Sequence, residues 1–156
     1  MRIQERLSIP ASQTHVWAFV WQTERLAACL PGCQRVVTLE PGKAYQAYMA
    51  DQFGPFRVEA VMAVTVEESH APDRIRLHAE GKDNRLGATQ IIDLTLDLSS
   101  PSESETILDV TGDFEVLGKV ASLGQFAIKR KANDVVKRFG PNIRAACTAA
   151  SGVRDA

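Results

Sequence analysis

The sequence has few of the residues from which catalytic and metal sites are usually built. Its 156 residues include three histidines and three cysteines, which are scattered along the chain. It has no GxSxG or HExxH motif, and Gly118 and Gly124 do not form the GxGxxG pattern of a dinucleotide site. Cys29 and Cys33 are separated by three residues, without a second pair or a nearby histidine to complete a zinc site. The sequence therefore predicts no metal and no catalytic residue.

Two pairs of carboxylates are the remaining candidates for acid–base chemistry. Asp93 and Asp97 share one face of a predicted strand, and so do Asp109 and Asp113. Such a pair can act as acid and base, but the same spacing is common on the solvent-facing side of a sheet. We expect the outer face of a sheet at both positions.

Long apolar runs and a strong net charge are also lacking. No apolar stretch approaches the ~20 residues of a membrane-spanning helix, and the first six residues, MRIQER, carry charge where a signal peptide needs an apolar core. The odd number of cysteines fits reduced thiols rather than a disulfide framework. The net charge of −1 gives no general attraction to nucleic acid. We expect a cytoplasmic protein that does not bind nucleic acid.

The composition is that of an ordinary globular domain, with 45% hydrophobic and 24% charged residues. A chain of this length can bury roughly 70% of the surface that its unfolded form exposes. We expect one domain over residues 1–150 and a disordered tail over 151–156. Alternating apolar residues and turn signals predict an α+β fold with a seven-stranded antiparallel sheet. The expected strands are 3–9, 35–39, 44–53, 56–67, 74–80, 86–98 and 106–115, with two short helices over 12–20 and 23–29.

A long C-terminal helix follows the last strand. At about 100° per residue, its apolar residues fall on one side: Ile128, Ala132, Val135, Val136, Phe139, Ile143 and Ala146. The same phase, extended back toward the strand, places Leu117, Ala121 and Gly124 on the inner side and Val120, Leu123, Phe126 and Ala127 on the outer side. A curved sheet that grips one helix leaves a hollow between them, so we expect an apolar cavity.

The residues expected to line this cavity come from the sheet and from the start of the helix. A small residue at Gly124 would leave room beneath the helix, and pockets for small ligands are mostly apolar. The same side chains could also be ordinary core. The expected ligand-binding residues are Phe53, Phe56, Val58, Met62, Leu117, Val120 and Gly124.

The outer face of the helix is strongly basic. From residue 119 to residue 144 there are seven lysines or arginines and one acidic residue, Asp134. This face is either simply solvated or a docking surface for an acidic partner or anionic lipid headgroups. The residues expected at such a surface are Leu123, Phe126, Lys129, Arg130, Lys131, Lys137 and Arg138.

Several short stretches resemble a known family. They are Ile9-Pro10-Ala11 with Val16-Trp17, Cys29-Leu30-Pro31-Gly32-Cys33, Gly54-Pro55, Ala79-Glu80-Gly81-Lys82, and Gly118-Lys119-Val120-Ala121 with Leu123-Gly124-Gln125. In these stretches and in its order of elements, the chain resembles the CoxG-like family, which is named after the G-subunit of carbon monoxide dehydrogenase. That family belongs to the START/Bet v 1-like (SRPBCC) superfamily, whose members have the helix-grip fold.

The resemblance implies a non-catalytic accessory protein of a molybdenum hydroxylase of the carbon monoxide dehydrogenase type. It implies docking of that enzyme at the cytoplasmic face of the membrane, and a quinone or other apolar ligand in place of a covalent cofactor. For this chain we expect any membrane contact to be peripheral and reversible. Two alternatives within the superfamily are a cyclase or aromatase and a stand-alone carrier of hydrophobic ligands. An enzyme needs inward-facing acid–base groups, whereas Phe56, Val58, Ala60 and Met62 are apolar.

Overall fold

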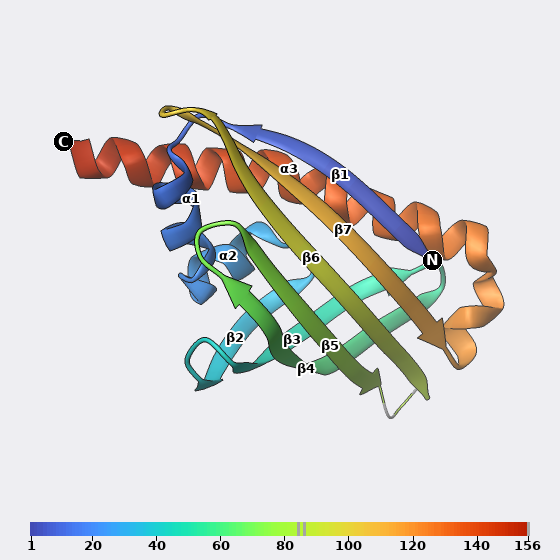
Figure 1. Ribbon diagram of the computed structural model, residues 1–156. Helices are drawn as coiled ribbons and strands as arrows, with labels where there is room; N and C mark the ends of the chain where they lie inside the picture. The colour runs from blue at the N-terminus through green and yellow to red at the C-terminus, as the bar shows by residue number, and fades with distance from the viewer. Residues whose placement is uncertain (84, 86, 156) are drawn as a thin grey trace.

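In the computed structural model, which describes residues 1–83, 85 and 87–155, one curved sheet wraps around a long C-terminal helix (Figure 1). The seven antiparallel strands lie in the order β1-β7-β6-β5-β4-β3-β2. This confirms the predicted helix-grip architecture. The elements are β1 (Arg2–Ile9), α1 (Gln13–Val20), α2 (Thr23–Cys29), β2 (Cys33–Glu40), β3 (Ala44–Phe53), β4 (Phe56–His70), β5 (Arg74–Asp83), β6 (Ala88–Ser102), β7 (Glu105–Leu117), the 3-10 helix η1 (Lys119–Leu123) and α3 (Gln125–Asp155).

Strand boundaries differ from the prediction mainly where hairpins continue further than their turn residues indicate. The sequence predicts a polar loop after Leu98, but Ser99 pairs with Ile107 and Ser102 pairs with Glu105. Cross-strand hydrogen bonding thus extends the β6–β7 hairpin through the serine-rich segment that was predicted to be a loop, and only a short turn remains. Leu86, the predicted first residue of the sixth strand, lies outside the described residues.

The two faces of the sheet have different environments. Val58, Ala60 and Met62 on β4 are buried, while Glu59 and Val61 between them are exposed, as expected for a strand with one face on the core. The main core lies between this concave face, the short helices and α3. It is centred on Ile9, Val16, Phe19, Ile75, Leu108 and Ile143.

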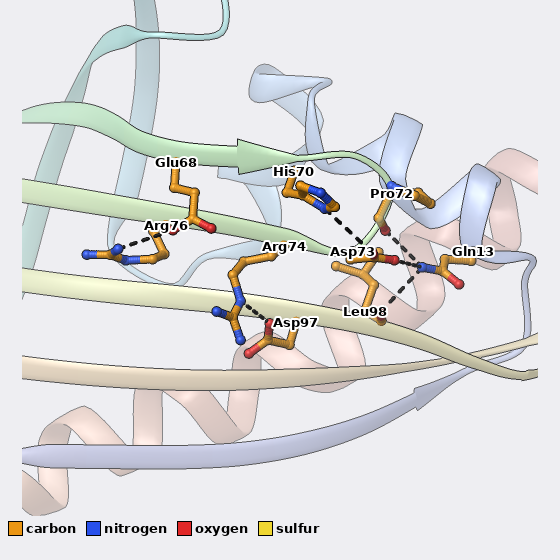
Figure 2. A network of polar contacts seen from close by, with 9 residues as sticks. All are labelled: Gln13, Glu68, His70, Pro72, Asp73, Arg74, Arg76, Asp97 and Leu98. Carbon is orange, nitrogen blue, oxygen red and sulfur yellow. Dashed lines mark hydrogen bonds and ion pairs between the residues drawn. The ribbon is translucent and has the colours of Figure 1, made fainter.

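The convex face carries ion pairs between neighbouring strands. Arg6 bonds Asp109 at 2.8 Å, and His78 Nδ1 lies 2.7 Å from an oxygen of Asp93. The hydrogen bond to Asp93 raises the pKa of His78 above its ordinary value. Arg74–Asp97 and Arg76–Glu68 continue the series (Figure 2). Both predicted carboxylate pairs therefore lie on the solvent side, where they are partners of basic residues.

Helices α1 and α2 lie at one end of the sheet, and η1 lies at the other (Figure 1). Ser12 accepts a hydrogen bond from the backbone N–H of His15 and so caps α1. The side-chain amide of Gln13 donates to the backbone oxygens of Pro72 and Leu98 at 2.9 and 3.3 Å (Figure 2). These bonds fix α1 to the β4–β5 turn and to β6, so one end of the concave face is closed.

The connection between β7 and α3 is not the continuous helix that the sequence predicts. Gly118 has φ 88° and ψ −156°, and Gly124 has φ 89° and ψ 155°, on either side of η1. These two breaks change the direction of the chain, so the helical phase of α3 does not extend back through η1. Val120 is consequently buried, with 1% of its surface exposed, whereas Leu117 is 44% exposed. Ala121 is also exposed, and the predicted inner and outer sides are wrong for these three residues.

Helix α3 continues through the region expected to be a disordered tail. Residues 151–155 belong to α3, and Ala156 lies outside the described residues. Along the middle of the helix the predicted core side is confirmed, because Ile128 and Ile143 are buried and Val135, Val136 and Phe139 are half-buried.

Candidate ligand-binding cavity

A cavity lies between the concave face of the sheet and α3. It has two adjacent compartments of about 240 Å³ each. Taken together, they come within the ~300–1,000 Å³ typical of pockets for small organic ligands. The two compartments lie side by side, because four residues line both of them: Leu30, Leu94, Val110 and Val136.

The first compartment, beside α2, is lined almost wholly by apolar side chains. Trp21 directly follows α1 and Leu26 lies on α2, while Tyr45 and Val66 come from the sheet and Phe139 from α3. Tyr45 is held in place because its hydroxyl accepts a hydrogen bond of 2.7 Å from the backbone N–H of Gly42. We call this space the α2 compartment. Its chemistry suits a hydrocarbon or aromatic group.

The second compartment lies beside the turn between β3 and β4, and we call it the hairpin compartment. Phe53 and Val58 line it from the two strands of this hairpin, and Ile128, Ala132 and Val135 line it from α3. A cluster of Val58, Ala88 and Val120 borders it, with Phe53, Phe56, Val116 and Leu123 packed around the cluster. Through Val120 and Leu123, η1 packs against residues that line this end of the cavity, Phe53 and Val58 among them.

The hairpin compartment also contains an ion pair. Lys131 of α3 donates a hydrogen bond of 3.0 Å to the carboxylate of Asp51 on β3. The exposed fractions of the two side chains are 23% and 28%, so the pair lies at the border between the cavity and solvent. The Lys131 nitrogen is also 5.8 Å from the centre of the Phe53 ring, within the range of a cation–π contact. The pair joins α3 to β3.

Comparison with known families fits this architecture. The sequence profile of CoxG, described as the G-subunit of carbon monoxide dehydrogenase, matches residues 6–148, which is most of the chain. The chain belongs to the CoxG family. No curated protein matches the sequence significantly.

Solved structures place this CoxG family member in the START-like fold. A conserved protein from Geobacillus kaustophilus aligns with a TM-score of 0.85 at 19% identity, covering 96% of each chain. A START superfamily protein from Mycobacterium smegmatis aligns with a TM-score of 0.77 at 12% identity, covering 95% of this chain and 97% of that one. The Zhui aromatase/cyclase from Streptomyces sp. R1128 aligns with a TM-score of 0.67 at 14% identity, covering 100% and 96%. At such identities the likeness is one of fold.

The predicted ligand-binding residues of this CoxG family member lie in different environments. Phe53 and Val58 line the cavity, and Phe56 and Val120 belong to the cluster that borders it. Met62 is buried and pairs with Gly81 on β5, whose missing side chain leaves room for the methionine sulfur. Leu117 is exposed.

Gly124 lies outside both compartments. A side chain at this position would meet no atom within 4 Å, and the residue is exposed and lines neither the α2 compartment nor the hairpin compartment. The glycine is required by its backbone angles, which other residues rarely adopt. The expectation that Gly124 leaves room for a ligand gains no support from these compartments and stays a prediction.

Sequence reasoning missed most of the α2 compartment. Trp21, Leu26 and Leu30 line it, but they lie in or beside short helices whose apolar residues are equally typical of core. Sequence reasoning also did not assign Asp51 to the cavity, although its position on β3 could have indicated this. Asp51 alternates with Phe53 and Met49 on the inward face, where an acidic residue is unexpected.

The predicted docking surface is formed in part. Phe126 is 80% exposed, and Lys129, Arg130, Lys137 and Arg138 are exposed along the same helix. Arg138 pairs with Asp134 at 3.6 Å. Leu123 and Lys131 are not part of this surface, because Leu123 packs against the cluster around Val120 and Lys131 turns to Asp51. We call Phe126, Lys129, Arg130 and Lys137 the basic face.

The three cysteines are free thiols. Burial raises the pKa of Cys147 to about 11, and it also raises the pKa of Cys29 and Cys33. A thiol with a raised pKa is a weak nucleophile and a weak metal ligand at neutral pH. Among the described residues, no group of three or more histidine, cysteine or acidic side chains could hold a metal ion. The described helices likewise include none that is both long and apolar enough to cross a membrane.

Proposed function

We propose that this chain is a non-catalytic accessory protein of a molybdenum hydroxylase of the carbon monoxide dehydrogenase type. It binds an apolar ligand, a quinone or a lipid, in the cavity beneath α3. The observation that carries the proposal is the pair of adjacent compartments, whose walls are largely aliphatic and aromatic. Membership of the CoxG family supports the association with the enzyme.

The chief alternative is an enzyme with the same fold. The Zhui aromatase/cyclase has this architecture. Because one fold hosts many functions, however, the choice between enzyme and binding protein rests on the side chains that line the site. Acid–base catalysis needs titratable groups placed around the reacting atoms. The titratable side chains that line the α2 compartment are Tyr45 and Cys33. The Tyr45 hydroxyl is bonded to the backbone of Gly42, and burial raises the pKa of the Cys33 thiol. The hairpin compartment contributes Asp51 and Lys131, which bind each other, and the solvent-exposed Glu115. This arrangement favours binding over catalysis.

Docking at the cytoplasmic face of the membrane is the second part of the proposal. The basic face combines one exposed aromatic ring with several cations on a single side of α3. An exposed apolar residue beside basic ones suits contact with the headgroup region of an anionic membrane. This contact is peripheral and reversible, and it brings the partner enzyme close to a membrane-borne ligand.

The ligand is tested by purifying the protein from its native cells and applying native mass spectrometry followed by solvent extraction. We expect a co-purifying apolar molecule of low molecular mass, and we expect its removal to change the fluorescence of Trp21, which lines the α2 compartment. Trp17 lies 6.0 Å from Trp21 between ring centres, so the measurement uses Trp17→Phe to leave one reporter. Ligand binding would be refuted if no such molecule co-purifies and the fluorescence of Trp21 does not change when quinones or lipids are added.

The membrane contact is tested by reversing two charges of the basic face. The double variant Arg130→Glu with Lys137→Glu should bind vesicles containing phosphatidylglycerol with an affinity at least about tenfold lower, as measured by co-sedimentation. The reason is that each basic residue near such a surface contributes ~1 kcal/mol to binding. Lys43→Glu with Lys82→Glu makes the same change in net charge on exposed residues of the sheet and its turns and should bind almost as the wild type does. Equal losses in both double variants would mean that net charge alone, and not this face, attracts the vesicles.

A further inference from the structure

The ion pair between Lys131 and Asp51 interrupts a largely apolar surface. Asp51 lies on the concave side of β3 between Met49 and Phe53, and all three line the hairpin compartment. Lys131 lies on the side of α3 that faces this strand, next to Ala132. Its ammonium is directed to the carboxylate, and its contact with the ring of Phe53 keeps it over the cavity wall.

The pair is not explained by stability alone. Removing two charges from water is costly, and a partly buried ion pair is often no more stabilising than well-packed apolar residues of the same size. Asp51 also accepts a hydrogen bond of 2.8 Å from the backbone N–H of Gln52, so the carboxylate has a fixed orientation. A fixed polar group at the end of an apolar pocket is the usual means by which a site orients and selects its ligand.

We propose that Lys131 and Asp51 form the polar end of the ligand site and select uncharged head groups with a carbonyl or hydroxyl oxygen over carboxylates. The proposal rests on the proposed binding of an apolar ligand in the same cavity. In addition to that binding, these two residues determine which amphiphiles bind, according to the charge of the head group.

The chemistry of the pair supports this selectivity. An ammonium group has three N–H donors, and the bond to Asp51 uses one of them. A carbonyl oxygen can accept from another, and a hydroxyl can in addition donate to Asp51. The positive and negative charges offset each other, so an uncharged head group meets no net repulsion. A carboxylate placed near Lys131 would lie close to the like charge of Asp51, which is unfavourable at a site partly shielded from water.

The test compares matched probes that differ only in the head group. Wild-type protein should bind decan-2-one and decan-1-ol at least about tenfold more tightly than decanoate at neutral pH, as measured by calorimetry. Asp51→Asn keeps an oxygen that can accept from Lys131 and removes the negative charge. We expect this variant to bind decanoate at least about tenfold more tightly than the wild type does, because the repulsion is gone and Lys131 is released to pair with the ligand.

Two further variants make the result specific. Asp134→Asn removes a carboxylate that is paired with Arg138 on the outer side of α3, and it should leave the ratio of ketone to carboxylate affinity unchanged. Asp51→Asn with Lys131→Gln removes both charges and should bind decanoate no more tightly than the wild type does. If the single variant is poorly folded, the affinities of the wild-type protein for the three probes still test the inference.

The outcomes separate this inference from the function on which it rests. If wild-type protein binds none of the three probes, ligand binding in the cavity fails and the inference fails with it. If all three bind and Asp51→Asn leaves their ratio unchanged, the cavity binds ligands but the ion pair does not select them. Tighter binding of decanoate than of decan-2-one by the wild type would overturn the inference directly.

Discussion

Replacing Gly118 with alanine should remove a large part of the folding stability. The backbone at this residue has φ 88° and ψ −156°, a region that is essentially restricted to glycine and costs other residues about 1–3 kcal/mol. An added methyl group would also overlap the carbonyl oxygen of Gly87 and lie 2.9 Å from its carbonyl carbon. Relief of such a clash requires backbone movement and adds about 1–3 kcal/mol. The expected loss, roughly 2–6 kcal/mol, is large beside the ~5–15 kcal/mol that stabilises a typical domain.

Gly124→Ala is the matched control for this prediction. Gly124 has nearly the same backbone conformation, φ 89° and ψ 155°, but a methyl group there meets no atom within 4 Å. This variant should therefore lose only the conformational part, about 1–3 kcal/mol. Urea unfolding of the two variants measures the difference, which is the cost of the contact with Gly87. Equal losses would show that the approach of η1 to the β5–β6 turn is not tight.

The close contact at Gly118 matters for the site because it sets where η1 lies. Gly87 belongs to the turn between β5 and β6, and the approach of the two backbones brings η1 onto the end of the sheet. Val120 is then buried against Val58 and Ala88. This packing supports Val58, which lines the hairpin compartment, so a loosened η1 would weaken the support of the compartment wall.

The fold was predictable because its signals are long and redundant. Seven alternating runs and one helix with apolar residues on a single side leave few arrangements, and the inward residues Val58, Ala60 and Met62 of β4 could be assigned from alternation alone. The breaks around η1 were harder to predict. The sequence shows Gly118 and Gly124 but not their backbone angles, and a short apolar stretch between two glycines is also compatible with a continuous helix. The burial of Val120 and the exposure of Leu117 depend on those angles.

The ion pair at the cavity was not predictable for a different reason. Lys131 lies about 60° from Ile128 around the helix, at the border between the apolar side and the basic side. At such a border a long side chain can turn either way, and the choice depends on what faces it. Asp51 is 80 residues earlier in the sequence, so its position opposite Lys131 follows from the strand register and not from any local pattern.

Filling the hairpin compartment should abolish most of the ligand affinity. Ala132 is a half-buried residue of α3 that lines this compartment, and Ala132→Phe would place an aromatic ring in space that a ligand needs. We expect the affinity for decan-2-one, measured by calorimetry, to fall at least about tenfold, which corresponds to about 1.4 kcal/mol. The thermal midpoint should not fall comparably, because the ring occupies a cavity and gains apolar contacts there.

Two other variants show where the ligand lies. Ala145→Phe places the same ring on an exposed position of α3 and should bind decan-2-one as the wild type does. Ala47→Phe fills the α2 compartment from β3. A ligand that spans both compartments is weakened by Ala132→Phe and by Ala47→Phe, while a ligand confined to one is weakened by one alone. Unchanged binding in both would mean that the cavity beneath α3 is not the binding site, since no apolar molecule of this size could share either compartment with the added ring.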